Sequence, residues 1–551
     1  MVKLKHEDRP TPKAVYNWRV YLASSVAAFA AVFIGYDGAF IGTALTFQDF
    51  KHTFGLDLMS PSEVANVSAN IVSAYQAGAI AGVILGYPAG IYLGRRWGLI
   101  GAASVFSIGA GIMLAATSST GLAPIYAGRV LAGAGIGAAS NLAPLYISEI
   151  APPAIRGQLL ALYEIGWQIG ALVGFWINYG ASRTIEPGRT QWLLSFAVQL
   201  VPSGIFLAGL WFLVESPRWL IRKGRREKGL KKLAYLRQLP IDHEYLQEEI
   251  QMIDAVIEED ERTLGRGFWA PFKVFRDRAL ASRLALTCLL FMWQNGFGIN
   301  AINYYSPTIL RNMGITGQNT SLLTTGVFGS LKCGLSIVWA FFLVESMGRR
   351  KMLMIGAVGA SIGMAVIAGI TGVVDPVANP STSVPPSAMA SLAFLYVWTI
   401  FYAVSWNGTP WVVVAESFSG SIQPVAQVFG AGSNWLWNFV ISRATPTMFL
   451  RMGPSGVGVF IFFALMMALS VPYVYFLLPE TKSVPREEVD RLFRKGLSPR
   501  HANAIVLAEL AAERENHTGA FASVPAHGSS GLGSEKDKGE EEYLESSRSA
   551  A

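Results

Sequence analysis

The stretch Gly94-Arg95-Arg96 follows an apolar run early in this sequence, and it returns as Gly348-Arg349-Arg350 after a similar run in the second half. A second motif is also repeated, because Glu215-Ser216-Pro217-Arg218 has a counterpart in Glu480-Thr481-Lys482. Repeats at corresponding places indicate two halves that are built alike and run in the same direction. Parallel repeats of this kind are typical of membrane transporters that bind their substrate between the halves.

The composition around these motifs is that of a polytopic membrane protein. Of the 551 residues, 52% are hydrophobic and 15% are charged, whereas soluble proteins carry about 25% charged residues. A helix needs about 20 apolar residues to cross the hydrocarbon core, and glycine-rich stretches such as 78–90 and 128–137 let helix backbones approach closely. We therefore predict an all-α membrane protein with twelve transmembrane helices in two parallel six-helix halves. The predicted spans are residues 19–46, 66–93, 97–117, 121–144, 157–180, 191–214, 280–312, 320–345, 350–372, 388–415, 421–449 and 455–478.

Basic residues set the expected orientation. They gather before the first span and after the second, fourth, sixth, eighth and twelfth spans, while the loops around 118, 315 and 375–387 carry almost none. Because basic loops stay in the cytoplasm, we expect both termini there, and we attribute the net charge of +7 to topology rather than to nucleic-acid binding. The predicted parts are a cytoplasmic N-terminus (1–18), the two halves (19–214 and 280–478), a cytoplasmic helical linker (215–279) and a cytoplasmic tail (479–551) that is disordered after about 515.

The placement of cysteine and histidine argues against several redox and metal functions. Cys288 and Cys333 lie in apolar runs, and all six histidines lie outside these runs. We therefore expect no disulfide framework, no thiolate metal site and no intramembrane haem. The spans also show no nucleophile–base pair, so the sequence predicts neither an enzyme nor a bound metal or cofactor.

Four ionisable residues fall well inside the predicted spans, namely Asp37, Arg129, Glu164 and Lys332. Such residues are costly in a bilayer and are usually functional. A carboxylate stays ionised beside a guanidinium, and it takes up a proton when a conformational change separates the two. Such a change could couple transport to a proton gradient at Asp37, or the residue could belong to a static ion pair that fixes two helices.

Longer motifs resemble the signatures of the sugar porter family of the major facilitator superfamily. They are Gly128-Arg129, Pro144-x-Tyr146-x-x-Glu149-x-x-Pro152-x-x-x-Arg156-Gly157, Gly298-Ile299-Asn300-Ala301, Tyr304-Tyr305-Ser306-Pro307 and Pro479-Glu480-Thr481-Lys482. Other motifs, such as Ser405-Trp406-Asn407-Gly408-Thr409-Pro410-Trp411, resemble the fungal quinate permease group, and galacturonate transporters resemble that group too. The resemblance implies the major facilitator fold and transport by alternating access.

The resemblance also assigns roles to single residues. In proton-coupled sugar porters the position of Asp37 is the proton site, and the position of Arg129 is its partner. Amide side chains in the central site suit the hydroxyl groups of a polyol, because an amide both donates and accepts hydrogen bonds, and Trp411 could cover an apolar ring face. Each of these residues could instead serve helix packing. The predicted substrate-binding residues are Glu164, Gln168, Gln294, Asn295, Asn300, Tyr304, Lys332, Trp411 and Asn434.

Two departures from the family pattern concern charged residues, and the lysine among them suggests an anionic substrate. Glu164 stands where sugar porters usually have Gln, and Lys332 lies in an otherwise apolar run from 322 to 344. A neutral hexose needs no buried ammonium, whereas a carboxylate substrate does, and Lys provides a point charge for an oxygen anion. Lys332 could instead pair with Glu164 or have a structural role, and Glu164 could be a second protonatable group.

A set of charged residues flanks the inner ends of the spans. In the family, such residues form salt bridges between the halves that hold the outward-facing state. Single surface pairs are weak, so only the network could bias the equilibrium; alternatively, the charges only set the topology. The set comprises Glu149, Arg156, Glu215, Arg218, Glu345, Arg349, Glu416 and Glu480.

These features together predict a transporter of a fungal plasma membrane that functions as a monomer. It would import quinate or a similar polyhydroxylated cyclic carboxylate together with protons, so its expected partners are the lipid bilayer, protons and a small polyol or carboxylate. One alternative is a proton symporter of the same fold for a neutral sugar or galacturonate. Another is a nutrient receptor that signals without transporting, which would have a long cytoplasmic extension.

Overall fold

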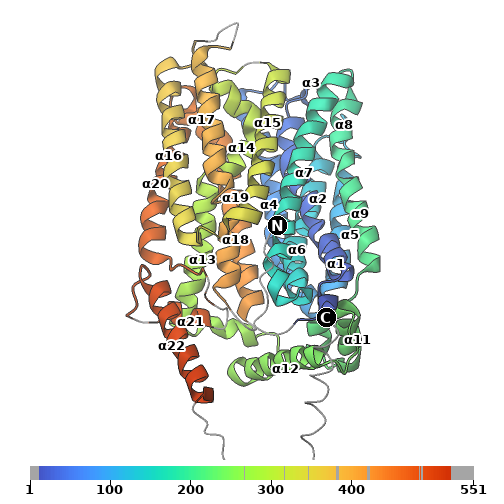
Figure 1. The fold of residues 1–551 in the computed structure, drawn as a ribbon. Helices are drawn as coiled ribbons and strands as arrows, with labels where there is room; N and C mark the ends of the chain where they lie inside the picture. Colours follow the sequence, from blue (N-terminus) through green and yellow to red (C-terminus); the bar gives the residue numbers. More distant parts are fainter. Residues whose placement is uncertain are drawn as a thin grey trace, which may run out of the picture. The chain divides into compact units, whose positions relative to one another are not determined.

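The computed structural model is all-helical over the residues it describes (Figure 1), which are 11–265, 267–315, 317–344, 346–379, 384–418, 422–482, 484, 488–494 and 496–522. One compact unit ends at Asn503 and contains the membrane bundle, and a second unit begins at Ala504. The second unit contains most of α22 (Ala502–Ala522), so the chain is helical beyond residue 515, where the sequence predicts disorder to begin. The rest of that predicted segment lies outside the described residues.

The first half contains six helical stretches, and the first and last of them are each interrupted once. The interruptions lie at Phe29, between α1 (Trp18–Ala28) and α2 (Ala30–Ala44), and at Gln199, between α8 (Arg189–Val198) and α9 (Leu200–Phe212). A short helix, α3 (Gln48–Thr53), follows α2. The four uninterrupted helices are α4 (Pro61–Tyr92), α5 (Arg95–Met113), α6 (Ala123–Ile150) and α7 (Arg156–Thr184).

The second half also contains two broken helices. The chain bends at Gly298, between α13 (Arg278–Gly296) and α14 (Ile299–Asn312), where the φ of +84° favours glycine. It bends again over residues 404–408, between α17 (Pro386–Ala403) and α18 (Thr409–Glu416). The remaining elements are α15 (Gln318–Val338) with its π-helical end η4 (Trp339–Leu343), α16 (Arg349–Val374), α19 (Ile422–Arg451), α20 (Val457–Leu477) and the short α21 (Val489–Leu492).

Ten helical stretches in the described part of the chain are long and apolar enough to cross a membrane, six in the first half and four in the second. The predicted seventh and eleventh spans, which are α13–α14 and α19, do not reach this threshold. Both contain polar side chains that face the protein interior, such as Gln294 and Asn295 on α13 and Asn438 on α19. The two least apolar membrane segments therefore both carry predicted site residues, among them Gln294 and Asn434.

Glycines bring α4 and α6 into backbone contact, as the sequence predicts. A Cβ atom added to Gly82 would strike the backbone of Ala134, and one added to Gly137 would strike the backbone of Ala79. Each helix therefore presents small residues to the other, and the two can pack more closely than larger side chains allow.

The main contacts between the two halves join α2 with α14, α4 with α19 and α7 with α15, and α6 also contacts α19. Figure 1 shows the first half in blue to teal beside the second half in green to orange. The linker forms α10 (Pro217–Arg222), α11 (Arg226–Arg237) and α12 (Glu244–Leu264) at one end of the bundle, which we call the linker end. Leu246, Ile250 and Ile253 form a small core there with Ile221 and Leu233.

Candidate functional site

A buried ion pair joins α2 and α6. Arg129 Nη1 donates to Asp37 Oδ1 at 2.9 Å and to Oδ2 at 2.8 Å, and both side chains are fully buried. The guanidinium also donates through Nε to the Ile71 carbonyl at 3.3 Å and lies 4.4 Å from the centre of the Tyr75 ring. Ile71 and Tyr75 belong to α4, so Arg129 has anchors that do not depend on Asp37.

Tyr304 connects this pair to the second half. A Cβ atom at Gly38, the residue after Asp37, would lie 3.9 Å from the Tyr304 hydroxyl. Gln76 of α4 and Asn438 of α19 interact with the same hydroxyl, and Gln76 Nε2 donates to Asn438 Oδ1 at 3.4 Å. The structure therefore places Asp37 and Tyr304, both predicted site residues, in one polar cluster that spans the two halves.

The Glu164 carboxylate forms a second polar centre. Its Oε1 accepts hydrogen bonds from Gln168 Nε2 at 2.7 Å and from Asn407 Nδ2 at 2.6 Å. Gln168 lies one turn further along α7, whereas Asn407 belongs to the second half and lies in the break between α17 and α18. Asn407 Nδ2 also donates to Ser336 Oγ of α15 at 3.2 Å. Glu164 is therefore tied to the second half through Asn407.

Lys332 lies one turn before Ser336 on α15 and is 4% exposed. Its ammonium interacts electrostatically with Glu164. The Lys332 nitrogen lies more than 4.0 Å from the Glu164 oxygens, so the two form no ion pair. Lys332 also forms no hydrogen bond with another described residue. Lys332 is therefore a buried cation of the second half that interacts with the half-buried Glu164 of the first half without a direct bond.

Three of the predicted amides bind to the protein itself. Gln294 Nε2 donates to two carbonyl groups of the α17–α18 break, both at 2.8 Å. Asn295 Nδ2 donates to the Phe291 carbonyl at 2.8 Å, and Asn300 donates to Asn295 Oδ1. These bonds lie within the second half and hold its two broken helices together.

Trp411 and Asn434 are half-buried members of the predicted site. The Trp411 ring lies 4.6 Å from the Phe291 ring. Asn434 has no hydrogen bond to another described residue, while its neighbour Trp435 donates to Ser140 of the first half at 3.2 Å. Asn434 therefore has amide groups available to a ligand, close to a contact between the halves.

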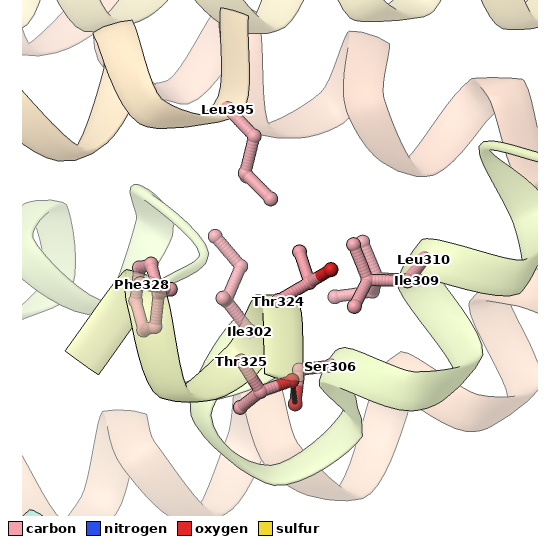
Figure 2. A pocket seen from close by; sticks show the side chains of 8 residues that line it. All are labelled: Ile302, Ser306, Ile309, Leu310, Thr324, Thr325, Phe328 and Leu395. Atoms are coloured by element: carbon pink, nitrogen blue, oxygen red, sulfur yellow. Dashed lines mark hydrogen bonds between the residues drawn. The ribbon is translucent and has the colours of Figure 1, made fainter. Parts of the chain in front are cut away.

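A small cavity lies in the second half between α14, α15 and α17 (Figure 2). Its volume is about 10 Å³, which has room for about one water molecule. The walls are mostly aliphatic, and Thr325 Oγ1 donates to Ser306 Oγ at 3.1 Å beside it. This cavity is too small for a ring-shaped substrate.

A larger cavity of about 490 Å³ opens at the linker end. Tyr87 and Asn141 of the first half, Lys223 of the linker and Pro424 of the second half are among its lining residues. Its volume falls in the range of small-molecule sites, and both halves contribute to its walls.

The family model described as "Sugar (and other) transporter" matches residues 23–493 of this chain. The chain belongs to the sugar transporter family. A probable quinate permease of Aspergillus niger is 53% identical over 505 residues, which cover 92% of this chain and 93% of that relative. The quinate permease of Emericella nidulans is 50% identical over 528 residues, which cover 96% and 97% of the two chains. This sugar transporter is therefore a membrane carrier and not an enzyme.

Solved structures place the sugar transporter in the major facilitator superfamily. The proton:xylose symporter XylE bound to 6-bromo-6-deoxy-D-glucose is 25% identical with a TM-score of 0.71, over 86% of this chain and 99% of that one. A partially occluded inward-open form of XylE from E. coli gives a TM-score of 0.70 at 23% identity, over 85% and 100% of the chains. The predicted all-α major facilitator fold is thus confirmed, and ten of the twelve predicted spans are long and apolar enough to cross a membrane.

At its linker end, the transporter carries a cluster of charges in the first half that we call the first clip. Arg95 Nη2 donates to Glu149 Oε1 at 2.7 Å. Glu215 Oε1 accepts from the backbone N–H groups of Arg95 at 2.9 Å and Arg96 at 3.1 Å. A carboxylate is favourable at the first turn of a helix, here α5. Burial raises the pKa of Glu215, while these backbone hydrogen bonds oppose the rise.

The second half of the transporter repeats the arrangement in a second clip. Arg349 Nη2 donates to Glu416 Oε1 at 2.7 Å. The Glu480 carboxylate accepts from the backbone N–H groups of Arg349 at 2.9 Å and Arg350 at 3.0 Å, at the first turn of α16. The repeated sequence motifs therefore correspond to repeated three-dimensional clusters.

The clips differ from the predicted role of these charges, which was to bridge the halves. Each described ion pair of the two clips joins residues of one half only. Arg218 of the linker interacts with Glu149 of the first half and with Glu249 of the linker, and burial lowers its pKa while both carboxylates oppose that change. Arg156 begins α7, and Glu345 lies outside the described residues. In this conformation the clips hold each half together rather than tying one half to the other.

Sequence reasoning missed three residues that the structure brings into the site. Asn407 lies inside a quoted motif, but nothing in the sequence identifies Glu164 as its partner. Arg95 is part of the repeated stretch and binds Glu149, which could have been inferred from the matching Arg349. Tyr75 gives no sequence signal, because an aromatic residue in an apolar helix is ordinary.

Proposed function

We propose that this transporter is a proton-coupled symporter of a fungal plasma membrane that imports quinate or a similar polyhydroxylated cyclic carboxylate by alternating access. The observation that carries the proposal is that Lys332 is a buried ammonium without a hydrogen bond or ion pair among the described residues, while Glu164 of the other half interacts with it only electrostatically. The identity of 50 to 53% with relatives named as quinate permeases supports the same substrate class.

The substrate chemistry follows from these two charges. A carboxylate bound at Lys332 supplies the anion that a buried ammonium needs, whereas a neutral hexose leaves this charge without a partner. Hydroxyl groups of the same substrate can donate to the Glu164 carboxylate and exchange hydrogen bonds with the Asn434 amide. The Trp411 ring offers an apolar surface to the carbon face of the ring.

Proton coupling is assigned to Asp37 and Arg129. Protonation of Asp37 removes the charge attraction across α2 and α6, while Ile71 and Tyr75 keep Arg129 in place. The helix that carries Asp37 is then free to shift against α6 and α14. A ligand shifts an equilibrium only through its different affinities for the two states. The proton must therefore have different affinities for the outward-facing and the inward-facing state, which we call the two facings.

The orientation proposed from the basic loops puts both termini and the linker end in the cytoplasm. The cavity of about 490 Å³ then lies on the release side of the transporter. The two clips keep each half intact while the halves rock against each other. We further propose that a monomer carries out transport.

Radiolabelled uptake in a permease-deficient yeast, run with and without a protonophore, tests the proposal. The panel contains quinate, galacturonate and glucose, and cells with an empty vector are the control. We expect quinate to accumulate above its external concentration and the protonophore to abolish this accumulation. Accumulation that survives the protonophore would refute proton coupling, and uptake of glucose or galacturonate without quinate would refute the substrate assignment.

A neutral sugar is the second candidate substrate. The observation in its favour is the solved XylE structure with a bound glucose derivative, at 25% identity. The same panel separates the two candidates, because a neutral-sugar symporter accumulates glucose and leaves quinate outside.

A further inference from the structure

The hydrogen bond between Asn407 and Glu164 differs from the other contacts between the halves. At 2.6 Å it is the shortest hydrogen bond that joins the two halves among the described residues, and its acceptor is a carboxylate. Other bonds between the halves, such as Trp176 Nε1 to Ser330 Oγ at 3.1 Å, join neutral groups. Hydrogen bonds to charged groups are about twice as strong as neutral ones.

The backbone around Asn407 is held firmly in position. Its N–H donates to the Tyr402 carbonyl at 3.1 Å, and its own carbonyl accepts from Gln294 Nε2 at 2.8 Å. The next residue, Gly408, has no room for a Cβ atom because the Trp339 ring lies against it. The Asn407 amide is therefore directed at Glu164 by the break between α17 and α18.

We propose that Asn407 is a positioning residue that acts as a substrate-displaced latch between the halves. In the empty transporter its amide occupies the Glu164 oxygen that a substrate hydroxyl takes on binding. The exchange preserves a hydrogen bond to the carboxylate but breaks the hydrogen bond that connects the halves. Substrate binding therefore also frees the two halves to move against each other. This inference rests on the proposed function.

A change of charge at residue 407 makes the latch testable. The charged and titratable groups that face Glu164 are Lys332 of α15, Tyr402 of α17 and Tyr163 of its own helix. In Asn407→Asp two carboxylates face each other, and they can form a hydrogen bond only when they share a proton. The double variant Glu164→Gln with Asn407→Asp reverses donor and acceptor and restores the bond at any pH.

Distance measurements on the full-length transporter in lipid nanodiscs test the latch without substrate. Spin labels at Leu93→Cys and Met347→Cys, two exposed positions at the linker end of different halves, report the populations of the two facings in a Cys288→Ser, Cys333→Ser background. We expect Asn407→Ala to change the population ratio about tenfold to a hundredfold, as for a lost hydrogen bond to a charged group. Asn407→Asp should show the same change at neutral pH and lose it at acid pH.

The double variant should restore the wild-type population ratio at neutral pH. The control is Ser330→Ala, which removes a neutral hydrogen bond between the halves and should change the ratio far less than Asn407→Ala does. A population ratio that Asn407→Ala leaves unchanged would overturn the latch, as would an Asp variant that is insensitive to pH or a double variant without rescue. Adding quinate to the wild type separates this inference from the proposed function. If the variants behave as expected and quinate changes nothing, the latch stands and the substrate assignment fails.

Discussion

Arg129 reaches both carboxylate oxygens of Asp37 through a single nitrogen, Nη1, and its Nη2 has no hydrogen-bond partner among the described residues. The guanidinium is therefore not saturated by the aspartate, and its Nε and its face are held by α4. Asp37 can leave this pair without releasing Arg129. In the proposed coupling mechanism, this asymmetry favours the aspartate as the partner that moves.

The variant Asp37→Asn should lose accumulation of substrate and keep exchange. It preserves the shape of the side chain but cannot bind and release a proton, so the accumulation ratio should fall to about one while counterflow of labelled substrate continues. Arg129 loses its anion, and we expect the free energy of unfolding to fall by about 3 to 5 kcal/mol. Uptake and counterflow in membrane vesicles measure the first effect, and thermal unfolding measures the second.

The matched control is Asp57→Asn, because Asp57 is exposed. It should leave accumulation and stability unchanged. If the Asp37 variant folds and still accumulates substrate, the coupling role of this carboxyl is wrong.

Lys332→Met should weaken binding of the anion selectively. The variant removes a charge-assisted hydrogen bond and should raise the KM for quinate about 10- to 100-fold. The methyl ester of quinate has no charge, and its affinity as an inhibitor should stay the same. The control Lys351→Met removes an exposed lysine and should affect neither ligand. Equal losses for both ligands would contradict a carboxylate contact.

Gly82→Ala should destabilise the first half, because the new methyl group would strike the backbone of Ala134. Overpacking of this kind costs about 1 to 3 kcal/mol. The matched control is Gly101→Ala on α5, where no atom lies within 4 Å of the added Cβ. Thermal unfolding in detergent should show a lower midpoint for the first variant only, and equal midpoints would argue against close packing of α4 and α6.

Glu480→Ala should weaken the second clip. The variant leaves the first N–H groups of α16 without their acceptor and should lower the free energy of unfolding by about 1 to 2 kcal/mol. Glu258→Ala, on the exposed surface of α12, is the control and should have no measurable effect. Because the clip lies within one half, the population ratio of the two facings should not move, and a clear shift would indicate a role between the halves.

The architecture could largely be predicted from the sequence, because apolar length, repeated motifs and glycine patterns are local signals. The predicted span 121–144 overlaps most of α6 (Ala123–Ile150), for example. The interruptions at Phe29 and Gln199 could not be predicted, since neither position contains the proline or glycine that marks a break. At both residues the backbone dihedral angles stay in the right-handed helical region, so each interruption is slight.

The site was predictable where chemistry alone selects the residue. Buried charges stand out in an apolar run, which identifies Asp37, Arg129, Glu164 and Lys332. Their partners are harder to predict, because Glu164 and Asn407 are 243 residues apart and meet only when the halves assemble. The linker-end charges show the same limit, since composition gives their sign but not the residue that each one binds.

The weak apolar character of α13–α14 and α19 has a consequence for biosynthesis. Neither segment meets the length and hydropathy that the ten other membrane stretches reach, so we expect each to insert next to helices that cover its amides. A nascent chain must then retain its seventh span until later helices emerge, and completion of the bundle becomes a cooperative step of assembly. Loss of an amide-binding neighbour would therefore first appear as a low amount of assembled protein in the membrane rather than as slow turnover.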